Sequence, residues 1–242
     1  MRRRAVPDWL TRWEYAHRGL HGNGVPENSL MGAWLAIDAG FGIECDIQRS
    51  ADGTAMVFHD WALDRLTEAE GQTEARRKDE LEAISYRESD EHIATLADLL
   101  ALVAGRAPLL IEIKSKTGYD IEKSCEAVAA ALASYSGEHA IMSFDPRVAR
   151  WFRKHSPLTC VGLVMREDEH GYTQSAWQRR MAYWIALPDF IAYHIAALPS
   201  HWVERLRKKG LPVLTWTVNS PETRRRALSR ADALISEGAG LA

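Results

Sequence analysis

The sequence predicts an α/β fold of the TIM-type (β/α)8 barrel class, and three observations support this prediction. The chain has 242 residues, and one such barrel commonly takes about 250 residues. Short apolar segments alternate along the chain with longer segments of helical periodicity. The apolar segments number eight, and alternation of this kind is typical of a parallel sheet covered by helices.

The candidate strands are short and mostly aliphatic: Glu14–His17, Ile43–Ile47, Leu109–Ile113, Ala140–Ser143, Cys160–Val164, Phe190–Tyr193, Pro212–Val218 and Ala233–Ile235. The candidate helices between them include Ser29–Ala39, Ile121–Tyr135, Pro146–Lys154, Ser200–Lys209 and Pro221–Ser229. Gly40 and Gly210 follow two of these helices, where a left-handed cap is favoured. An open doubly wound sheet is the alternative, but no G-x-G-x-x-G motif follows a strand.

The segment Asp60–Glu91 interrupts the alternation of strands and helices. It is polar and charged, contains Gly71 and has few apolar positions. We therefore interpret residues 59–91 as a small insertion that leaves the barrel. The chain shows no Ser/Gly/Pro-rich linker and no repeat, so we expect a single domain over residues 1–242.

Composition excludes several classes of protein. A hydrophobic content of 46% suffices for a sizeable core, and a net charge of −3 gives no electrostatic reason to bind nucleic acid. No segment approaches the ~18 apolar residues that a membrane span needs. Cys45, Cys125 and Cys160 lack C-x-x-C spacing, which argues against a disulfide framework and a structural zinc site. We expect a cytoplasmic protein.

The first chemical signal is a His-Arg pair at the end of the first candidate strand. His17 can exchange a proton near neutral pH, and Arg18 can form paired hydrogen bonds to phosphate oxygens. The alternative is structural: His17 caps a strand, and Arg18 pairs with Glu27.

The second signal is a set of acidic residues on two strands. Glu44 and Asp46 share one face of their strand because side chains alternate, and Glu112 and Lys114 share one face of another. Buried carboxylates are costly unless a cation meets them, and hard oxygen ligands suit Mg²⁺ or Ca²⁺. Lys114 could neutralise a phosphate oxygen. The alternatives are an exposed acidic edge strand and an internal Glu–Lys ion pair.

Two further residues complete the candidate site. The turn at Asp52-Gly53 predicts a hairpin, which would return His59 to the neighbourhood of Glu44 and Asp46. Trp216 lies near the C-terminal end of a candidate strand, where a barrel enzyme binds its substrate, and could wall a leaving group. The alternatives are a packed histidine and a core tryptophan.

Together these residues match the needs of phosphodiester hydrolysis. A cation must hold the phosphate, and positive groups must offset charge on its oxygens. One group must activate the nucleophile while another protonates the leaving alkoxide. Histidines, carboxylates, an arginine and a lysine are all predicted near the ends of the first three candidate strands.

In their order along the chain, these motifs resemble the glycerophosphodiester phosphodiesterase family. The segments that carry the resemblance are His17-Arg18-Gly19, Pro26-Glu27-Asn28-Ser29, Glu44-Cys45-Asp46, Asp52-Gly53, His59-Asp60, Leu63-Asp64-Arg65-Leu66-Thr67, Thr95-Leu96, Glu112-Ile113-Lys114, Ser143-Phe144-Asp145 and Trp216-Thr217-Val218-Asn219. They cover nearly the whole chain.

The resemblance implies a (β/α)8 barrel with its insertion after the second strand. It implies an acid–base pair, His17 and His59. It also implies a single divalent cation, Mg²⁺ or Ca²⁺, whose ligands are Glu44, Asp46 and Glu112. Arg18 and Lys114 are implied phosphate contacts. Glu27 and Asn28 are implied supports of the site, with Glu27 near the metal. The implied reaction converts a small glycerophosphodiester into sn-glycerol 3-phosphate and an alcohol.

One segment departs from the family pattern, and several alternatives stay open. Ser236-Glu237-Gly238-Ala239 stands where the family has a Thr-Asp-x-Pro-like turn. A phospholipase-D-like lyase, which forms a cyclic phosphate from lysophospholipids, is the main alternative function. A zinc hydrolase and a non-enzymatic binding module are weaker alternatives. The headgroup, the metal, the roles of the two histidines and the oligomeric state are left open.

Overall fold

The computed structural model describes residues 6–168 and 173–241. The chain divides into two compact units: unit 1 comprises Met1–Tyr15 and His139–Ala242, and unit 2 comprises Ala16–Glu138. The short strand β1 (Tyr15–Ala16) spans the point where the sequence passes from unit 1 to unit 2. The prediction of a single domain stays a prediction.

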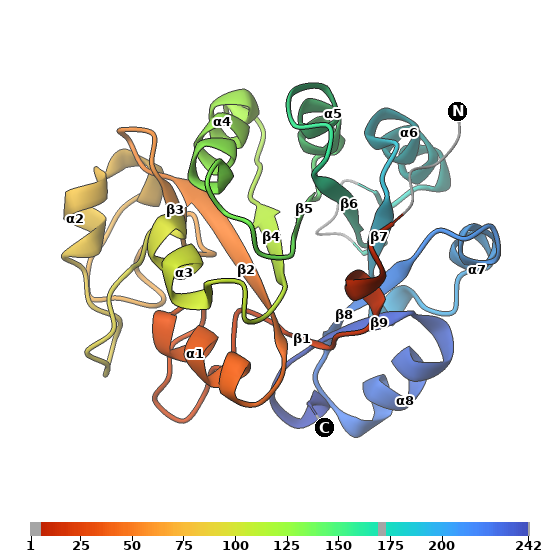
Figure 1. The fold of residues 1–242 in the computed structure, drawn as a ribbon, viewed down its shortest axis with the longest axis horizontal. Helices are drawn as coiled ribbons and strands as arrows, with labels where there is room; N and C mark the ends of the chain where they lie inside the picture. The colour runs from red at the N-terminus through yellow and green to blue at the C-terminus, as the bar shows by residue number, and fades with distance from the viewer. Residues whose placement is uncertain (1–5, 169–172, 242) are drawn as a thin grey trace. The chain divides into compact units, whose positions relative to one another are not determined.

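Unit 2 contains a sheet of β4, β2 and β3 with its helices (Figure 1). Its elements are α1 (Leu30–Asp38), β2 (Gly42–Arg49), β3 (Ala55–Val57), the 3-10 helix η2 (Thr73–Ala75), α2 (Lys78–Glu82), α3 (Leu96–Val103), β4 (Leu109–Ile113) and α4 (Ile121–Leu132). Strand β2 pairs in parallel with β4. It pairs antiparallel with β3, as the predicted hairpin requires. Strand β2 therefore lies inside the sheet, which excludes the exposed edge strand considered above.

Unit 1 contains a run of parallel strands in the order β5-β6-β7-β8-β9. Its elements are η1 (Asp8–Thr11), β5 (His139–Ser143), α5 (Pro146–His155), β6 (Cys160–Met165), α6 (Ala176–Ala186), β7 (Phe190–His194), η3 (Ile195–Ala197), α7 (His201–Lys208), β8 (Val213–Val218), α8 (Pro221–Arg230), β9 (Ala233–Ser236) and η4 (Gly238–Gly240). The atypical segment after β9 forms η4. Arg224 of α8 donates to Glu14 at 2.9 Å, which ties the N-terminal segment to this unit.

The order of elements is that of a (β/α)8 barrel, as predicted. All eight candidate strands are present, with boundaries shifted by a few residues. The glycines predicted to cap helices do so: Gly40 has a φ of +80° and Gly210 a φ of +79°. Three helices, α2, α3 and α6, were not among the candidate helices. None of the helices in the described part of the chain has the length and apolarity that crossing a bilayer demands.

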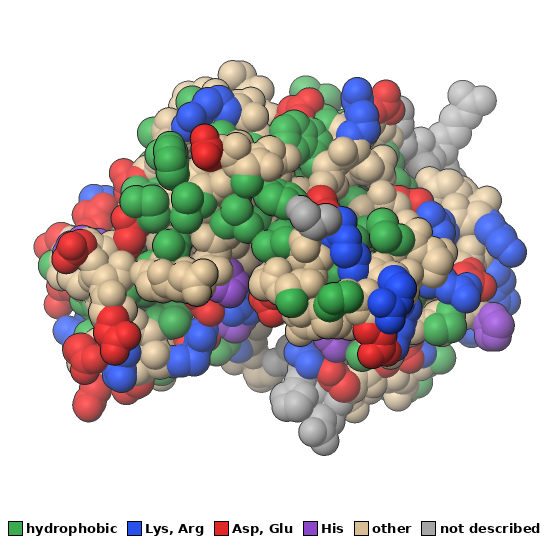
Figure 2. Space-filling view, turned by 90° about the horizontal axis from the view of Figure 1, so that it is seen from below, with side chains coloured by type: hydrophobic (Ala, Val, Ile, Leu, Met, Phe, Trp, Pro, Cys, Tyr) green, Lys and Arg blue, Asp and Glu red, His purple; other side chains and the backbone are tan. Residues whose placement is uncertain are grey.

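The insertion after the second strand packs in a small hydrophobic cluster that it shares with β3 and with the residues that flank the insertion. The buried side chains of this cluster are Met56, Phe58, Leu63, Leu81, Tyr86 and Ile93. Outside it the insertion is charged: Figure 2 shows acidic and basic side chains of both signs at the left, where the insertion lies. The insertion therefore packs as an ordered extension of unit 2 next to the candidate site.

Candidate active site

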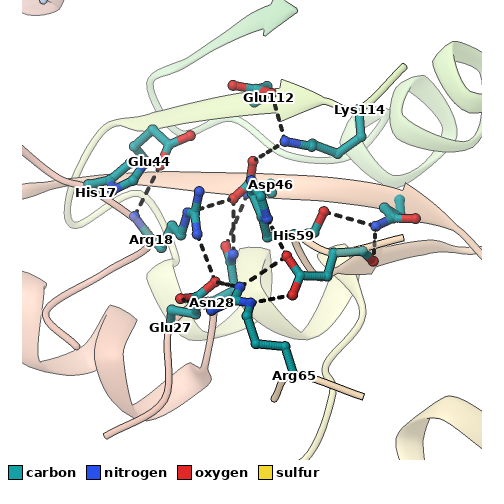
Figure 3. Close-up of polar contacts among 12 residues, drawn as sticks. His17, Arg18, Glu27, Asn28, Glu44, Asp46, His59, Arg65, Glu112 and Lys114 are labelled. Carbon is teal, nitrogen blue, oxygen red and sulfur yellow. Dashed lines mark hydrogen bonds and ion pairs between the residues drawn. The ribbon is translucent and has the colours of Figure 1, made fainter. Parts of the chain in front are cut away.

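The candidate site forms around the C-terminal ends of strands in unit 2 (Figure 3). His17 and Arg18 follow β1, and the next residue, Gly19, turns the chain with a φ of +79°. A Cβ atom on Gly19 would lie 2.8 Å from the backbone carbon of Gly32 in α1. Glycine is therefore required at this turn, both by its φ and by the close approach of α1.

Three carboxylates meet on one face of the sheet. Asp46 of β2 and Glu112 of β4 are direct neighbours in the parallel register, and Glu44 lies two residues before Asp46. Each of the three offers an oxygen within 4.8 Å of the others, and their exposed fractions are only 2%, 2% and 7%. Ligands on opposite sides of a Ca²⁺ ion stand about 5 Å apart. The predicted convergence of these residues is therefore present, at a spacing that suits one cation.

Burial and mutual repulsion make this cluster electrostatically costly. Burial, followed by the charges of Asp46 and Glu112, raises the pKa of Glu44 well above its ordinary value. Burial alone would also raise the pKa of Asp46, but the charges of Lys114, His59 and Arg18 lower it below the ordinary value. The cluster thus depends on positive charge from its surroundings.

Two fixed cations supply part of that charge. The Arg18 guanidinium binds Glu27 at 2.8 Å and lies 3.2 Å from Asp46, and its backbone N–H donates to Glu44 at 3.0 Å. The Lys114 ammonium lies 3.3 Å from Asp46 and 3.2 Å from Glu112. Both ion pairs that were considered as structural alternatives are therefore formed, and they lie inside the carboxylate cluster.

The two histidines approach the same cluster. His17 Nε2 lies 3.9 Å from Glu44, and His17 and His59 are both close enough to Asp46 to lower its pKa. His59 Nδ1 lies 2.6 Å from Asp60. This contact favours the tautomer that carries its proton on Nδ1, so the other ring nitrogen of His59 points away from Asp60.

Glu27 and Asn28 hold the surrounding groups in place. Asn28 donates its side-chain amide to Asp46 at 3.1 Å, and its carbonyl oxygen accepts from the Asp46 backbone at 3.0 Å. Burial would raise the pKa of Glu27, but its hydrogen bonds to Arg65 and Arg18 lower it. Asn28 thus holds Asp46 at two points, one on its carboxylate and one on its backbone N–H.

Comparison with known proteins identifies the family. A model of the glycerophosphoryl diester phosphodiesterase family matches residues 17–237. The chain belongs to this family. It is 28% identical over 238 residues to a glycerophosphodiester phosphodiesterase of Caldanaerobacter subterraneus subsp. tengcongensis, covering 92% of each chain. Family membership makes the chain an enzyme that cleaves phosphoric diesters.

Solved structures agree on the fold. A phosphodiesterase of Oleispira antarctica in complex with the product sn-glycerol-3-phosphate matches with a TM-score of 0.81 and 24% identity, covering 93% of this chain and 92% of that chain. A glycerophosphodiester phosphodiesterase of Thermotoga maritima matches with a TM-score of 0.74 and 26% identity, covering 92% of each chain. The glycerophosphoryl diester phosphodiesterase fold is thus the predicted TIM-type barrel.

Trp216 belongs to unit 1 and lies in an aromatic and cationic cluster. Its ring centroid is 4.8 Å from that of His194 and 5.4 Å from that of Phe144, and Arg166 lies 5.8 Å above its ring. The indole N–H donates to the Ala192 carbonyl at 3.0 Å. Trp216 is therefore half-buried and held by its neighbours on the ends of β5, β6 and β7.

Sequence reasoning gave no role to three residues of this glycerophosphoryl diester phosphodiesterase site. Arg65 of the insertion donates to Glu27 at 2.6 Å and to Asp60 at 3.0 Å, and Gln48 donates to the His59 carbonyl at 2.9 Å. Asp60 and Arg65 lie in two of the motif segments, although no chemistry was assigned to them. Gln48 could have been found from the alternation of β2, because it shares a face with Asp46.

Proposed function

We propose that this enzyme hydrolyses glycerophosphodiesters to sn-glycerol 3-phosphate and an alcohol, with a divalent cation, Mg²⁺ or Ca²⁺, bound by Glu44, Asp46 and Glu112. The observation that carries the proposal is the convergence of these buried carboxylates within 4.8 Å. The sn-glycerol-3-phosphate bound to the Oleispira antarctica phosphodiesterase supports the proposed product.

The charge balance of the site fits a divalent cation. Its carboxylates are Glu27, Glu44, Asp46, Asp60 and Glu112, and its fixed cations are Arg18, Arg65 and Lys114. With neutral histidines, five carboxylates against three cations leave two negative charges in a largely buried site. A bound divalent ion would offset them, and it would polarise the phosphate as a Lewis acid.

In the proposed mechanism, side chains of unit 2 move the protons. One of His17 and His59 accepts a proton from the nucleophile, and the other donates a proton to the leaving oxygen. Asp60 holds the proton of His59 on Nδ1, so that the opposite nitrogen exchanges protons with the substrate. Arg18 and Lys114 lie against the carboxylates and are the proposed contacts of the phosphate oxygens.

Trp216 is the proposed wall for the leaving alcohol. Its half-buried ring, with Phe144, His194 and Arg166 around it, supports this role. If the proposal is right, Trp216→Ala raises KM for glycerophosphocholine more than it lowers kcat.

A turnover assay tests the proposed function directly. Glycerophosphocholine and glycerophosphoethanolamine are incubated with chelated enzyme to which Mg²⁺ or Ca²⁺ is returned, and products are followed by phosphorus NMR. We expect His17→Ala and His59→Ala each to lower kcat by roughly 10²–10⁴-fold. His201→Ala, whose side chain is fully exposed on α7, is the matched control and should retain activity.

Two outcomes would contradict the proposal. Near-normal turnover by either active-site histidine variant would remove that histidine from the chemistry. Accumulation of a cyclic phosphate as the final product, with lysophosphatidylcholine as the preferred substrate, would instead indicate the lyase reaction.

We also propose that the enzyme works in a reducing compartment, the cytoplasm. The support is that Cys45, Cys125 and Cys160 are all buried free thiols, as expected where disulfides do not form. Fractionation of cells that express the tagged chain tests this. Recovery of the chain outside the cytoplasmic fraction would contradict it.

A further inference from the structure

Helix α6 of unit 1 turns its largest apolar side chains outward. Trp177, Met181, Trp184 and Leu187 are 62%, 51%, 75% and 40% exposed. The first three are spaced by four and three residues, so they lie on one face of the helix, and Leu187 at the C-cap extends that face. We call these four residues the α6 stripe.

The opposite face of α6 explains why the stripe is not part of the core. The buried residues of this helix are Ala182 and Ala186, whose small side chains bring the helix close to the rest of unit 1. A helix of a globular protein normally buries its larger apolar residues. Here the arrangement is inverted, so core packing does not account for the stripe.

Basic residues lie on the same helix as the stripe and on the neighbouring helix α5. Arg180 lies on the same helical face, between Trp177 and Trp184. The sequences of α6 and of its contacting neighbour α5 contain no Asp or Glu, although the whole chain carries a net charge of −3. Arg150 and Lys154 of α5 are exposed, and within the described ranges neither they nor Arg180 form an ion pair. In the described ranges, α6 and α5 therefore combine exposed aromatic area with three exposed basic side chains that form no ion pair.

We propose that the α6 stripe docks this enzyme on the surface of an anionic phospholipid bilayer. Tryptophan rings favour the boundary between headgroups and acyl chains, and arginine and lysine can extend their charged ends to lipid phosphates. Each basic residue near such a surface strengthens binding, and the effect falls with salt.

The positive charge of α6 and α5 argues against a second copy of the chain as the partner of the α6 stripe. A two-fold contact brings the same patch of both copies together. It would therefore place Arg180 and its basic neighbours against their own equivalents, where like charges repel. An anionic bilayer complements both the apolar stripe and its positive surroundings.

Vesicle binding by the full-length protein tests the proposal. The protein is sedimented with vesicles of phosphatidylcholine alone or of phosphatidylcholine with phosphatidylglycerol. We expect binding to the anionic vesicles that weakens as salt is raised. The double variant Trp177→Ser/Trp184→Ser should weaken binding at least about tenfold, because each ring loses its burial in the lipid boundary. Arg150→Gln/Arg180→Gln should weaken binding to anionic vesicles only.

Matched controls separate docking from general surface effects. Trp34→Ser removes another exposed tryptophan, on α1 of unit 2, and Arg205→Gln/Arg225→Gln removes two exposed arginines from α7 and α8. We expect these controls to bind vesicles like the parent chain. All variants should hydrolyse dissolved glycerophosphocholine at the parent rate, because none changes the candidate active site.

Three results would overturn the proposal. The first is no binding to anionic vesicles at low salt. The second is binding that the stripe variants and the controls weaken equally. The third is self-association in sedimentation equilibrium that the stripe variants abolish without any vesicle binding, which would assign the stripe to a second copy.

Discussion

At the scale of single residues, the contact between Asp60 and His59 carries a clear expectation. Asp60 lies 2.6 Å from Nδ1 of His59, and its pKa is lowered because hydrogen bonds to His59 and Arg65 outweigh the effect of burial. Replacing the carboxylate by an amide removes the acceptor that fixes the tautomer. Asp60→Asn should therefore lower kcat at least about tenfold with little change in KM.

A double-variant cycle distinguishes this positioning role from a general loss of structure. If Asp60 acts through His59, Asp60→Asn should cost nothing further in a His59→Ala background. Asp64→Asn changes an exposed carboxylate of the same insertion and serves as the control. Additive losses in the double variant would show that Asp60 supports the fold and not His59.

The turn residue of the His-Arg-Gly motif gives a second expectation. Gly19 has a φ of +79°, and a Cβ there would collide with the Gly32 backbone at 2.8 Å. The left-handed conformation alone costs an alanine about 1–2 kcal/mol, to which the collision adds. Gly19→Ala should lower the midpoint of urea unfolding and also the turnover, because Arg18 precedes the turn. Gly22→Ala, where φ is +113° but a Cβ meets nothing within 4 Å, carries the backbone cost without the collision and should lower turnover less than Gly19→Ala does.

Much of the candidate site could be predicted from the residues alone. Alternation within a strand places Glu44 and Asp46 on one face, and a parallel neighbour supplies Glu112, so their convergence follows from strand geometry. The contacts of Arg65 could not be predicted in this way. They depend on how the insertion folds back on unit 2, which no local pattern in a charged segment encodes.

At the scale of elements, the insertion offers a prediction about a buried hydroxyl. Tyr86 is 3% exposed, and its hydroxyl has no hydrogen-bond partner among the described residues. An unsatisfied buried hydroxyl is costly. Tyr86→Phe should therefore leave the free energy of unfolding at pH 7 unchanged or raise it by about 1 kcal/mol, as measured by urea titration.

Tyr86 should also make the stability of the fold depend on pH in the alkaline range. Burial, with smaller effects from Glu27 and Glu91, raises the pKa of Tyr86 in the folded state above its ordinary value of 10.0. The unfolded chain therefore releases this proton first, and stability falls as the pH rises through the unfolded pKa. At pH 11 the parent should lose about 1.4 kcal/mol more than Tyr86→Phe. Parallel losses in both proteins would contradict this expectation.

Helices show where sequence reasoning fails at this scale. The periodic helices α4 and α5 were predicted because their apolar residues mark the buried face. Helix α6 has its alanines inside and its tryptophans outside, so its hydrophobic pattern identifies the wrong face. Helix α3 is apolar over most of its length and gives no contrast between faces. The strands were found more completely, because buried parallel strands are apolar on both faces.

At the scale of the whole molecule, metal binding should be visible as stability. An ion that binds the folded carboxylate cluster and not the unfolded chain stabilises the folded state. At one hundred times its dissociation constant this amounts to about 2.7 kcal/mol, a rise in Tm of roughly 5–10 °C for a chain of this size. Calorimetry of chelated protein with Mg²⁺ or Ca²⁺ returned measures the shift. Glu44→Gln/Glu112→Gln should abolish it, and an unchanged shift in that variant would place the ion elsewhere.

The division of the sequence between the two units has a consequence for synthesis. Unit 2 is one continuous segment, Ala16–Glu138, whereas unit 1 joins the first residues of the chain to its last hundred. The ribosome therefore synthesises all of unit 2 before it makes β5–β9, and the carboxylate cluster can assemble on the nascent chain. Glu14 is synthesised early, but its ion pair can form only after Arg224 has been translated, 210 residues later.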